Sequence, residues 1–293
     1  MRKLLPIMVI AAALAGGAYV GLKRRGVEKP IPRGKALVAS FLNADQGGAV
    51  VFETPEGSFV VFDPGFEENV DALAGYLKTV GARSVTLVVT FPSREYAAAA
   101  RKLIGSFPVD RVIHGEMPSV SREWDKTLEA IKQARIPELI LAGGDLLHLS
   151  KKVKLEVLSP PRGLLEGAEE ASGNNSLVTR VSFGRTRFLL TSQARIEVEG
   201  HLIQSVRDLE SSVLVVPRHG QSGSTSLELI SLVRPECFVV MDGGRGGRPS
   251  ASVLARISTR NTGAQVLRTD KDGSFDIVSD GRSIEVVKEV RKP

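Results

Sequence analysis

The sequence of 293 residues has a single cysteine, Cys237, so no internal disulfide can form. It also lacks low-complexity stretches and collagen-like repeats, and 42% of its residues are hydrophobic, which excludes a disordered chain. Only four histidines are present, and this limits the imidazole ligands that a zinc site could use. The composition is that of a folded protein that buries a sizeable core, in one large domain or two ordinary ones.

Acidic residues are scarce only at the N-terminus. The whole chain has a net charge of +6 and a pI near 9.5, which taken alone suggests a nucleic-acid partner. Residues 1–35, however, contain eight basic side chains and one acidic side chain, and the remaining 258 residues contain 31 basic and 32 acidic ones. The positive charge therefore belongs to a leader, and the body of the protein is close to neutral.

The leader contains 19 uncharged residues, positions 4–22, between basic residues at positions 2–3 and 23–25. At about 1.5 Å per residue, a helix of this length spans a bilayer core of roughly 30 Å. We expect residues 1–25 to be an uncleaved transmembrane anchor that contacts the bilayer through residues 4–22. A secretory signal peptide cleaved after Ala15 is the alternative, because residues 13–15 fit the small-residue cleavage pattern.

Two features of the leader point to opposite orientations of the body. The basic cluster after the span favours a cytoplasmic body, whereas the short basic head before a signal-like core favours export. We expect a single-pass membrane protein whose body is extracytoplasmic.

After a linker at residues 26–35, the sequence offers no further domain boundary, so residues 36–290 are expected to form one domain. Hydrophobic periodicity and turn residues predict strands and helices that alternate in two halves. Such a pattern predicts an α/β sandwich whose sheets are covered on their outer faces. The expected strands are 36–42, 49–52, 58–62, 85–89, 111–113, 153–158, 177–183, 186–191, 213–216, 237–241, 275–278 and 284–287, and the expected helices are 70–80, 94–104, 123–133, 195–205, 227–233 and 252–258.

Several segments, taken in order, resemble the metallo-β-lactamase fold, and specifically the soluble hydrolase-like domain of the competence DNA-uptake protein ComEC. The resemblance implies a four-layered αββα sandwich, here preceded by one N-terminal transmembrane or signal helix. The segments that carry it are Thr54–Gly57 with Val61–Gly65, Leu87–Thr90, Ala142–Asp145, Asn174–Val178 with Phe188–Thr191, Val216–Gly220 and Arg268–Gly273.

The metal-binding motifs of that family are degenerate in this sequence. Active members carry a His-x-His-x-Asp-His run after the strand that ends in Thr, and this chain has Phe-Pro-Ser-Arg-Glu-Tyr at residues 91–96. The place of the metal-bridging Asp is occupied by Ser192-Gln193, a His-His-Gly-Ser motif reads Arg218-His219-Gly220-Gln221, and a Gly-His-Pro element reads Gly247-Arg248-Pro249. The residual motif positions are Asp63, Glu95, Gln193 and His219.

A hydrolytic zinc site needs three or four nitrogen or oxygen donors and an open position for water. The resemblance implies zinc or manganese, but the sequence offers at most Asp63, Glu95 and His219, so we expect no bound metal and no catalytic residue. The predicted function is a catalytically inactive binding or scaffold module. The alternative is a phosphodiesterase-like or nuclease-like hydrolase of the ComEC type with a metal site rebuilt around the same three residues. The other histidines, His114, His148 and His201, are expected on the surface or in loops.

Arginines stand at or beside several of the lost motif positions. A guanidinium is permanently charged and can bind phosphate or carboxylate oxygens in a bidentate manner. Arg94, Arg218 and Arg248, with His219, are therefore candidate binding residues for an anionic ligand or nucleic acid. Equally, the arginines could pair with the protein's own carboxylates at Asp63, Glu95, Asp242 and Asp270, or face solvent.

Two glycine- or serine-rich segments are expected to be structural. Residues 243–247 lack the Lys-Ser/Thr of a phosphate-binding loop, so we expect an ordinary loop there. Residues 222–224 lack the context of a catalytic serine, and we expect them to cap the helix that follows.

Overall fold

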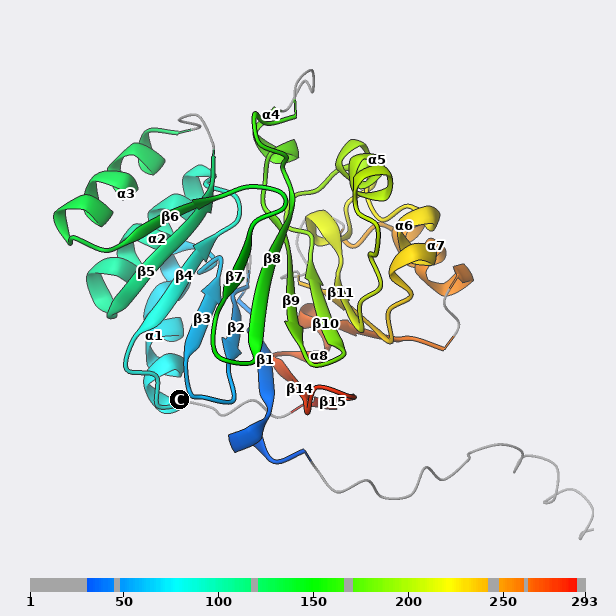
Figure 1. Cartoon of the computed structure of the whole chain (residues 1–293), viewed down its shortest axis with the longest axis horizontal. Helices are drawn as coiled ribbons and strands as arrows, with labels where there is room; N and C mark the ends of the chain where they lie inside the picture. Colours follow the sequence, from blue (N-terminus) through cyan, green and yellow to red (C-terminus); the bar gives the residue numbers. More distant parts are fainter. Residues whose placement is uncertain are drawn as a thin grey trace, which may run out of the picture. The chain divides into compact units, whose positions relative to one another are not determined.

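The computed structural model describes residues 31–44, 48–116, 121–165, 171–241, 248–260 and 263–288 (Figure 1). The expected membrane span at residues 4–22 and the glycine-rich loop at 243–247 lie outside this part of the chain. Within it, no helix has both the length and the apolar character needed to cross a membrane.

Two mixed sheets form the frame of the described structure. The first contains, in spatial order, β15 (Ile284–Val287), β14 (Phe275–Ser279), β1 (Leu37–Phe41), β2 (Val50–Glu53), β3 (Phe59–Phe62), β4 (Val85–Val89), β5 (Val109–Gly115) and β6 (Glu138–Leu141). The second contains β13 (Gln265–Arg268), β12 (Cys237–Val240), β11 (Val213–Val215), β10 (Thr186–Leu190), β9 (Val178–Phe183), β8 (Val153–Ser159) and β7 (Leu146–His148).

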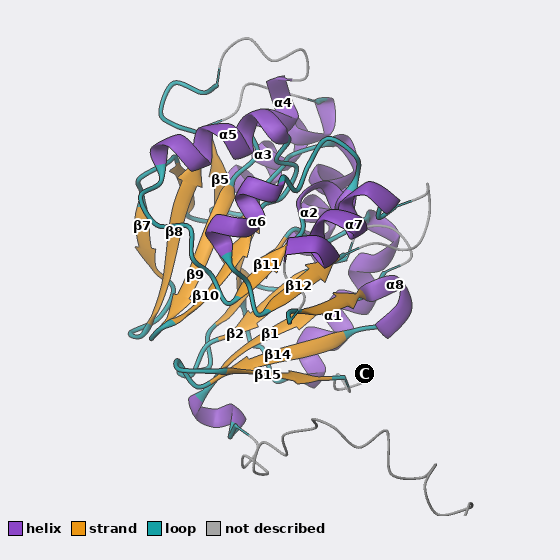
Figure 2. Cartoon of the chain, turned by 90° about the vertical axis from the view of Figure 1, so that its right-hand side faces the viewer, coloured by secondary structure: helices purple, strands orange, loops and turns teal. Residues whose placement is uncertain are grey.

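Helices cover the outer face of each sheet (Figure 2). The first sheet packs against α1 (Val70–Thr79), α2 (Arg94–Ser106) and α3 (Arg122–Gln133), and the second against α5 (Ile196–Ser205), α6 (Leu227–Val233) and α7 (Ala251–Arg260). Two short helices, α4 (Ala171–Asn174) and α8 (Thr269–Asp272), complete the set of α-helices in the described residues. The sandwich of two sheets with outer helices that the sequence predicts is therefore present.

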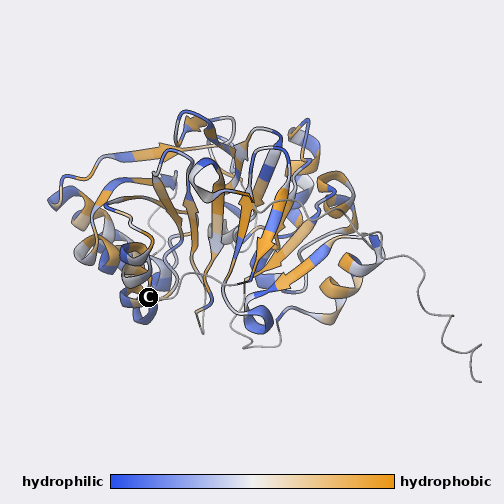
Figure 3. Cartoon of the chain, turned by 90° about the horizontal axis from the view of Figure 1, so that it is seen from below, coloured by the Kyte–Doolittle hydropathy of each residue, from blue (hydrophilic) through white to orange (hydrophobic). Residues whose placement is uncertain are grey.

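The central strands, such as β1, β3, β4 and β12, are buried on both faces, which explains their continuous hydrophobic runs. In β3, Val60 and Phe62 point into the core between the two sheets, whereas Phe59 and Val61 point toward the helices. Phe52 of β2 links the sheets, because its ring lies 5.5 Å from the rings of both Phe62 and Phe188. Figure 3 shows the result, with hydrophobic residues concentrated on the strands.

Strand directions place the carboxyl ends of several strands together. Strands β3, β4, β5 and β6 run parallel to one another, as do β10, β11, β12 and β13. The loops that follow β3, β4, β10, β11 and β12 meet at one edge of the sandwich, which we call the cavity edge. Functional side chains of parallel sheets commonly lie at such an edge.

Each expected strand and helix of the body is present, within a few residues at either end. Among the described strands and α-helices, five short ones were not foreseen: β6, β7, β13, α4 and α8. The expected position of His114 is wrong. Its side chain is buried near the end of β5, with Nε2 2.7 Å from Glu138 Oε1 and Nδ1 2.8 Å from the Gly115 carbonyl oxygen. Its ring also meets Trp124 edge to face, so His114 joins β5, β6 and α3.

The expected cap of α6 is also corrected. Ser226, not residues 222–224, is the N-cap residue, and its hydroxyl accepts a hydrogen bond from the Leu229 amide at 3.1 Å. Ser224 instead donates its hydroxyl to the carbonyl oxygens of Pro217 and Gln221 and is fully buried. Its role is to hold the preceding loop together.

Candidate functional site

A small cavity of about 60 Å³ lies at the cavity edge, between the two sheets. Each of the strands β3, β4, β10, β11 and β12 contributes residues at or just after its end, and α2 contributes Tyr96. The lining residues are Gly48, Val50, Phe62, Asp63, Thr90, Tyr96, Leu190, Ser192, Gln193, Val215, Val216, His219 and Met241.

A chain of hydrogen bonds runs through Asp63, Thr90 and Ser192 on one side of the cavity. Asp63 Oδ1 accepts the Thr90 amide at 2.8 Å, and Asp63 Oδ2 accepts the Thr90 hydroxyl. Thr90 Oγ1 also lies 2.6 Å from Ser192 Oγ. Since the Thr90 proton is donated to the carboxylate, Ser192 is the donor in the second bond, and the chain is directed from Ser192 to Asp63.

Burial shapes the acidity of Asp63. Desolvation raises its pKa to about 6, although the hydrogen bonds from Thr90 and from the Phe91 amide act in the opposite direction. Within the described residues, Asp63 makes no ion pair. Carboxyl groups with strongly displaced pKa values cluster at functional sites, and Asp63 lies in a cavity, so it is a candidate site residue.

His219 occupies the other side of the cavity, and a hydrogen bond to the backbone of Met241 fixes the orientation of its ring. Nδ1 lies 2.5 Å from the Met241 carbonyl oxygen, so Nδ1 carries the proton and Nε2 is the acceptor. Nε2 lies 3.4 Å from both Tyr96 Oη and Gln193 Nε2. The ring of Tyr96 is in turn held against Phe66, with 5.8 Å between the ring centroids.

Four residues at or next to the cavity have left-handed backbone conformations without being glycine. The φ angles are 47° at Asp63 and Ser192, 53° at Arg218 and 57° at His219. This conformation costs an ordinary residue about 1–2 kcal/mol. The surrounding structure compensates in part, because the Arg218 amide donates to the Ser192 carbonyl oxygen at 2.9 Å and so ties two of the strained loops together.

The structure brings three of the sequence-predicted residues together, Asp63, Gln193 and His219. Arg94 and Glu95 do not reach the cavity, because they lie exposed on the outer side of α2, beside Arg101 and Lys126.

Arg218 and Arg248 do not line the cavity either. Their backbones flank it, and Gly220 lies so close to Pro249 that an added Cβ would come within 2.5 Å of the Pro249 Cβ. The three candidate arginines therefore do not converge on this cavity. The hydroxyls of Thr90 and Ser192 and the inward position of Tyr96 were not foreseen as parts of one site.

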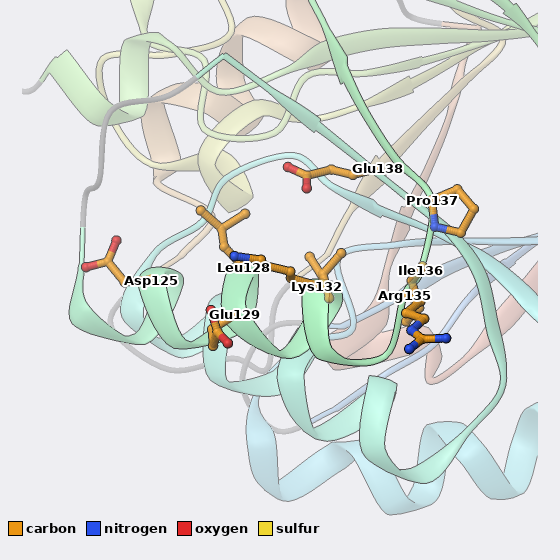
Figure 4. A pocket seen from close by; sticks show the side chains of 9 residues that line it. Asp125, Leu128, Glu129, Lys132, Arg135, Ile136, Pro137 and Glu138 are labelled. Atoms are coloured by element: carbon orange, nitrogen blue, oxygen red, sulfur yellow. The ribbon is translucent and has the colours of Figure 1, made fainter.

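A larger open hollow of about 630 Å³ lies between α3 and β6 (Figure 4). Its charges are mixed, and it contains none of the predicted site residues. The side chains that line it are Asp125, Leu128, Glu129, Ile131, Lys132, Arg135, Ile136, Pro137 and Glu138.

Solved structures with the same arrangement of sheets and helices define the fold. YhfI from Bacillus subtilis, a metallo-β-lactamase-fold protein, aligns with a TM-score of 0.50 at 9% identity over 79% of this chain and 96% of its own. CmlA, a diiron β-hydroxylase from Streptomyces venezuelae, aligns with a TM-score of 0.50 at 12% identity over 82% of this chain and 54% of its own. The protein described here is a metallo-β-lactamase-fold protein, as the sequence predicts.

In sequence, the chain is similar to ComE operon protein 3 of Bacillus subtilis (strain 168), with 26% identity over 253 residues. The alignment covers 85% of this chain and 30% of the length of that protein. No family model matches the chain. The ComEC-like resemblance inferred from the sequence motifs thus agrees with this ComE operon relative.

The donors at the cavity can be compared with the zinc or manganese centre that the fold implies. Both oxygens of Asp63 accept bonds from Thr90, and one nitrogen of His219 is committed to the Met241 carbonyl. Over the described ranges, no group of three or more His, Cys, Asp or Glu side chains could hold a metal ion. These residues therefore do not fit the usual three- or four-donor centre.

Proposed function

We propose that this protein is a binding or scaffold module that has the metallo-β-lactamase fold but does not carry out metal-dependent hydrolysis. Residues 4–22 tether it to the membrane, and its body is extracytoplasmic. The observation that carries the proposal is the donor set of the cavity, in which hydroxyl and amide groups stand at the positions where metal ligands are expected.

The polar side chains at the motif positions are already engaged with one another. Ser93, at a lost histidine position, uses its hydroxyl to cap α2 by accepting the Tyr96 amide at 3.3 Å. Tyr96, at another, lies beside His219, and Ser192 bonds to Thr90.

The cavity is also small for a substrate. Its volume of about 60 Å³ is far below the roughly 300–1,000 Å³ of typical small-molecule pockets, and it holds only a few water molecules. Both features favour a module that uses its outer surface rather than this cavity.

Metal binding and hydrolysis test the proposal directly. The full-length protein, equilibrated with Zn²⁺ or Mn²⁺ and freed of excess metal, is expected to retain far less than one ion per chain. It is also expected not to hydrolyse bis-p-nitrophenyl phosphate above background. The variant His219→Ala is expected to give the same result as the wild type, as is the control His201→Ala on α5.

A near-stoichiometric metal content that disappears in His219→Ala but persists in His201→Ala would overturn the proposal. Metal-dependent hydrolysis that is lost in His219→Ala but kept in His201→Ala would instead establish the rebuilt metal site. Binding of an anionic ligand at Arg94, Arg218 and Arg248 remains a separate prediction, to be tested by single alanine substitutions.

A further inference from the structure

A second site lies at the edge of the sandwich opposite the cavity edge, where β3, β4 and β5 begin. An open hollow of about 560 Å³ is found there, and we call it the basic hollow. Side chains from the first sheet and from the hairpin between β7 and β8 line it together. The lining residues are Gly57, Ser58, Phe59, Gly81, Arg83, Ser84, Thr86, Asp110, Arg111, His148 and Leu149.

The cations of the basic hollow are not neutralised within the described structure. Neither Arg83 nor Arg111 makes an ion pair or a side-chain hydrogen bond there. One acid, Asp110, lines the hollow, and its Oδ2 accepts the Ser84 hydroxyl at 2.5 Å. Guanidinium groups bind phosphate oxygens in other proteins, often in a bidentate manner.

The β7–β8 hairpin adds further positive charge. Lys154 is the register partner of His148 in the antiparallel pair, so the two side chains lie on the same face of the sheet. Lys151 and Lys152, in the hairpin turn, are exposed. Glu56, next to the lining residue Gly57, is exposed and adds one acid to this rim. The basic hollow and its rim are thus cationic, although the body as a whole is neutral.

The chain enters the domain at this same edge (Figure 1). Strand β1 runs antiparallel to β2, and β2 runs antiparallel to β3, so β1 and β3 begin at the same edge. Ile31, the first described residue, is held there because its amide donates to Glu285 Oε2 at 3.1 Å. Glu285 lies on β15, which is five strand spacings from β4 along this edge, or about 24 Å.

The segment between the predicted span and the domain is short. Residues 23–30 reach at most about 28 Å when fully extended. The edge that contains Ile31 must therefore stay close to the bilayer if residues 4–22 are embedded in it.

We propose that the basic hollow binds the phosphate group of an anionic phospholipid and docks this edge of the domain on the bilayer. Arg83 and Arg111 hold the phosphate oxygens, and the lysines of the β7–β8 hairpin supply additional positive charge. The inference rests on the membrane tether of the proposed function. Electrostatic attraction to anionic headgroups is strongest within about 10 Å of the surface, which the short tether makes accessible.

Hydrogen–deuterium exchange of the full-length protein reconstituted in vesicles tests the proposal. Vesicles of phosphatidylcholine alone are compared with vesicles that also contain phosphatidylglycerol. We expect slower exchange in residues 57–59, 82–86 and 149–152 only when phosphatidylglycerol is present. In the double variant Arg83→Ala/Arg111→Ala, the affinity of this edge for phosphatidylglycerol should fall roughly 30-fold. Each cation near an anionic surface contributes a factor of about five to that affinity.

The control removes two exposed cations elsewhere, in Lys126→Ala/Lys132→Ala on α3, and is expected to behave as the wild type. Equal protection in phosphatidylcholine vesicles, or protection that survives in Arg83→Ala/Arg111→Ala, would overturn the proposal. Protection by inorganic phosphate without anionic lipid would assign the site to a free anion instead. Flotation with phosphatidylcholine vesicles reports on the tether alone, so a failure of the tether is distinguished from a failure of the basic hollow.

Discussion

Asp63 shows how a single residue can link the stability of this fold to its site. Its carboxylate receives hydrogen bonds from neutral groups but, within the described structure, no cation offsets its burial. The folded protein therefore binds a proton at Asp63 more readily than the unfolded chain does. Ionisation of this residue at neutral pH opposes folding, and the strained backbone at the same position adds to that cost.

The pH dependence of unfolding tests this role of Asp63. Its pKa is about 6 in the folded state and 3.8 in the reference state, so stability is lost as pH rises from about 4 to 6. The full difference is equivalent to about 3 kcal/mol. Asp63→Asn should lack this loss and should be more stable than the wild type at pH 7, as measured by urea unfolding between pH 4 and 8.

Asp71→Asn is a suitable control, because Asp71 is exposed and pairs with Lys102 at the surface. If Asp63→Asn keeps the slope of the wild type between pH 4 and 6, the buried carboxylate is not its source.

Side-chain direction decided which site residues could be predicted from the sequence. Arg94, Glu95 and Tyr96 are consecutive in the first turn of α2, and neighbouring residues of a helix point about 100° apart. The sequence favoured Glu95 as a site residue because it is the one carboxylate in this motif. Its side chain faces outward, however, whereas Tyr96 faces the cavity. Asp63 and His219 could be predicted because each belongs to a motif that follows directly on a hydrophobic strand. Thr90 and Ser192 could not, since their bond joins residues 102 positions apart.

At the scale of elements, α6 depends on a carboxylate from another helix. Glu199 of α5 is 1% exposed, and it accepts the amides of Thr225 and Ser226 at the start of α6. Burial raises the pKa of Glu199, but these bonds and the charge of Arg256 act against the rise. This contact acts together with the Ser226 cap, and neither involves residues 222–224, where the sequence had suggested the cap.

Removal of this carboxylate should destabilise the protein. Glu199→Ala leaves two buried amides without an acceptor, which should lower the free energy of unfolding by about 2–4 kcal/mol. Glu197→Ala, two residues earlier on the exposed side of α5, should change it by less than about 0.5 kcal/mol. Urea unfolding of both variants at pH 7 measures the difference, and equal effects would show that Glu199 does not hold α6.

The elements that were missed are short and lie mostly at sheet edges. Strands β6 and β7 end the two sheets, and β6 alternates between exposed and half-buried residues. Ile140 and Leu146 are about half exposed, so hydrophobicity in these segments does not report burial. Pairing with β5 and β8 forms these strands, and that contact is not visible in the local sequence. The long central runs were predictable because both of their faces are buried.

At the scale of the whole molecule, the predicted anchor can be tested without reference to the site. Full-length protein in membranes should remain in the pellet after extraction with alkaline carbonate, because a span of 19 uncharged residues is held by the hydrophobic effect. Protease added to intact cells or spheroplasts should reach the body if it is extracytoplasmic. Intact-mass analysis should find residues 1–15 retained. Release by carbonate, or a mature chain that begins at Gly16, would indicate a cleaved signal peptide instead.

The strand directions in the first sheet have a practical consequence for the design of fusion proteins. β15 runs parallel to β1, so Val287 lies at the cavity edge while Ile31 lies at the edge of the basic hollow. Lys288 is held at the cavity edge by its ion pair with Asp272, at 2.9 Å. A fluorescent protein or affinity tag joined directly after residue 287 would leave the domain beside the cavity. The same tag joined ahead of residue 31 would leave the domain at the opposite edge, where β1, β3 and β15 begin.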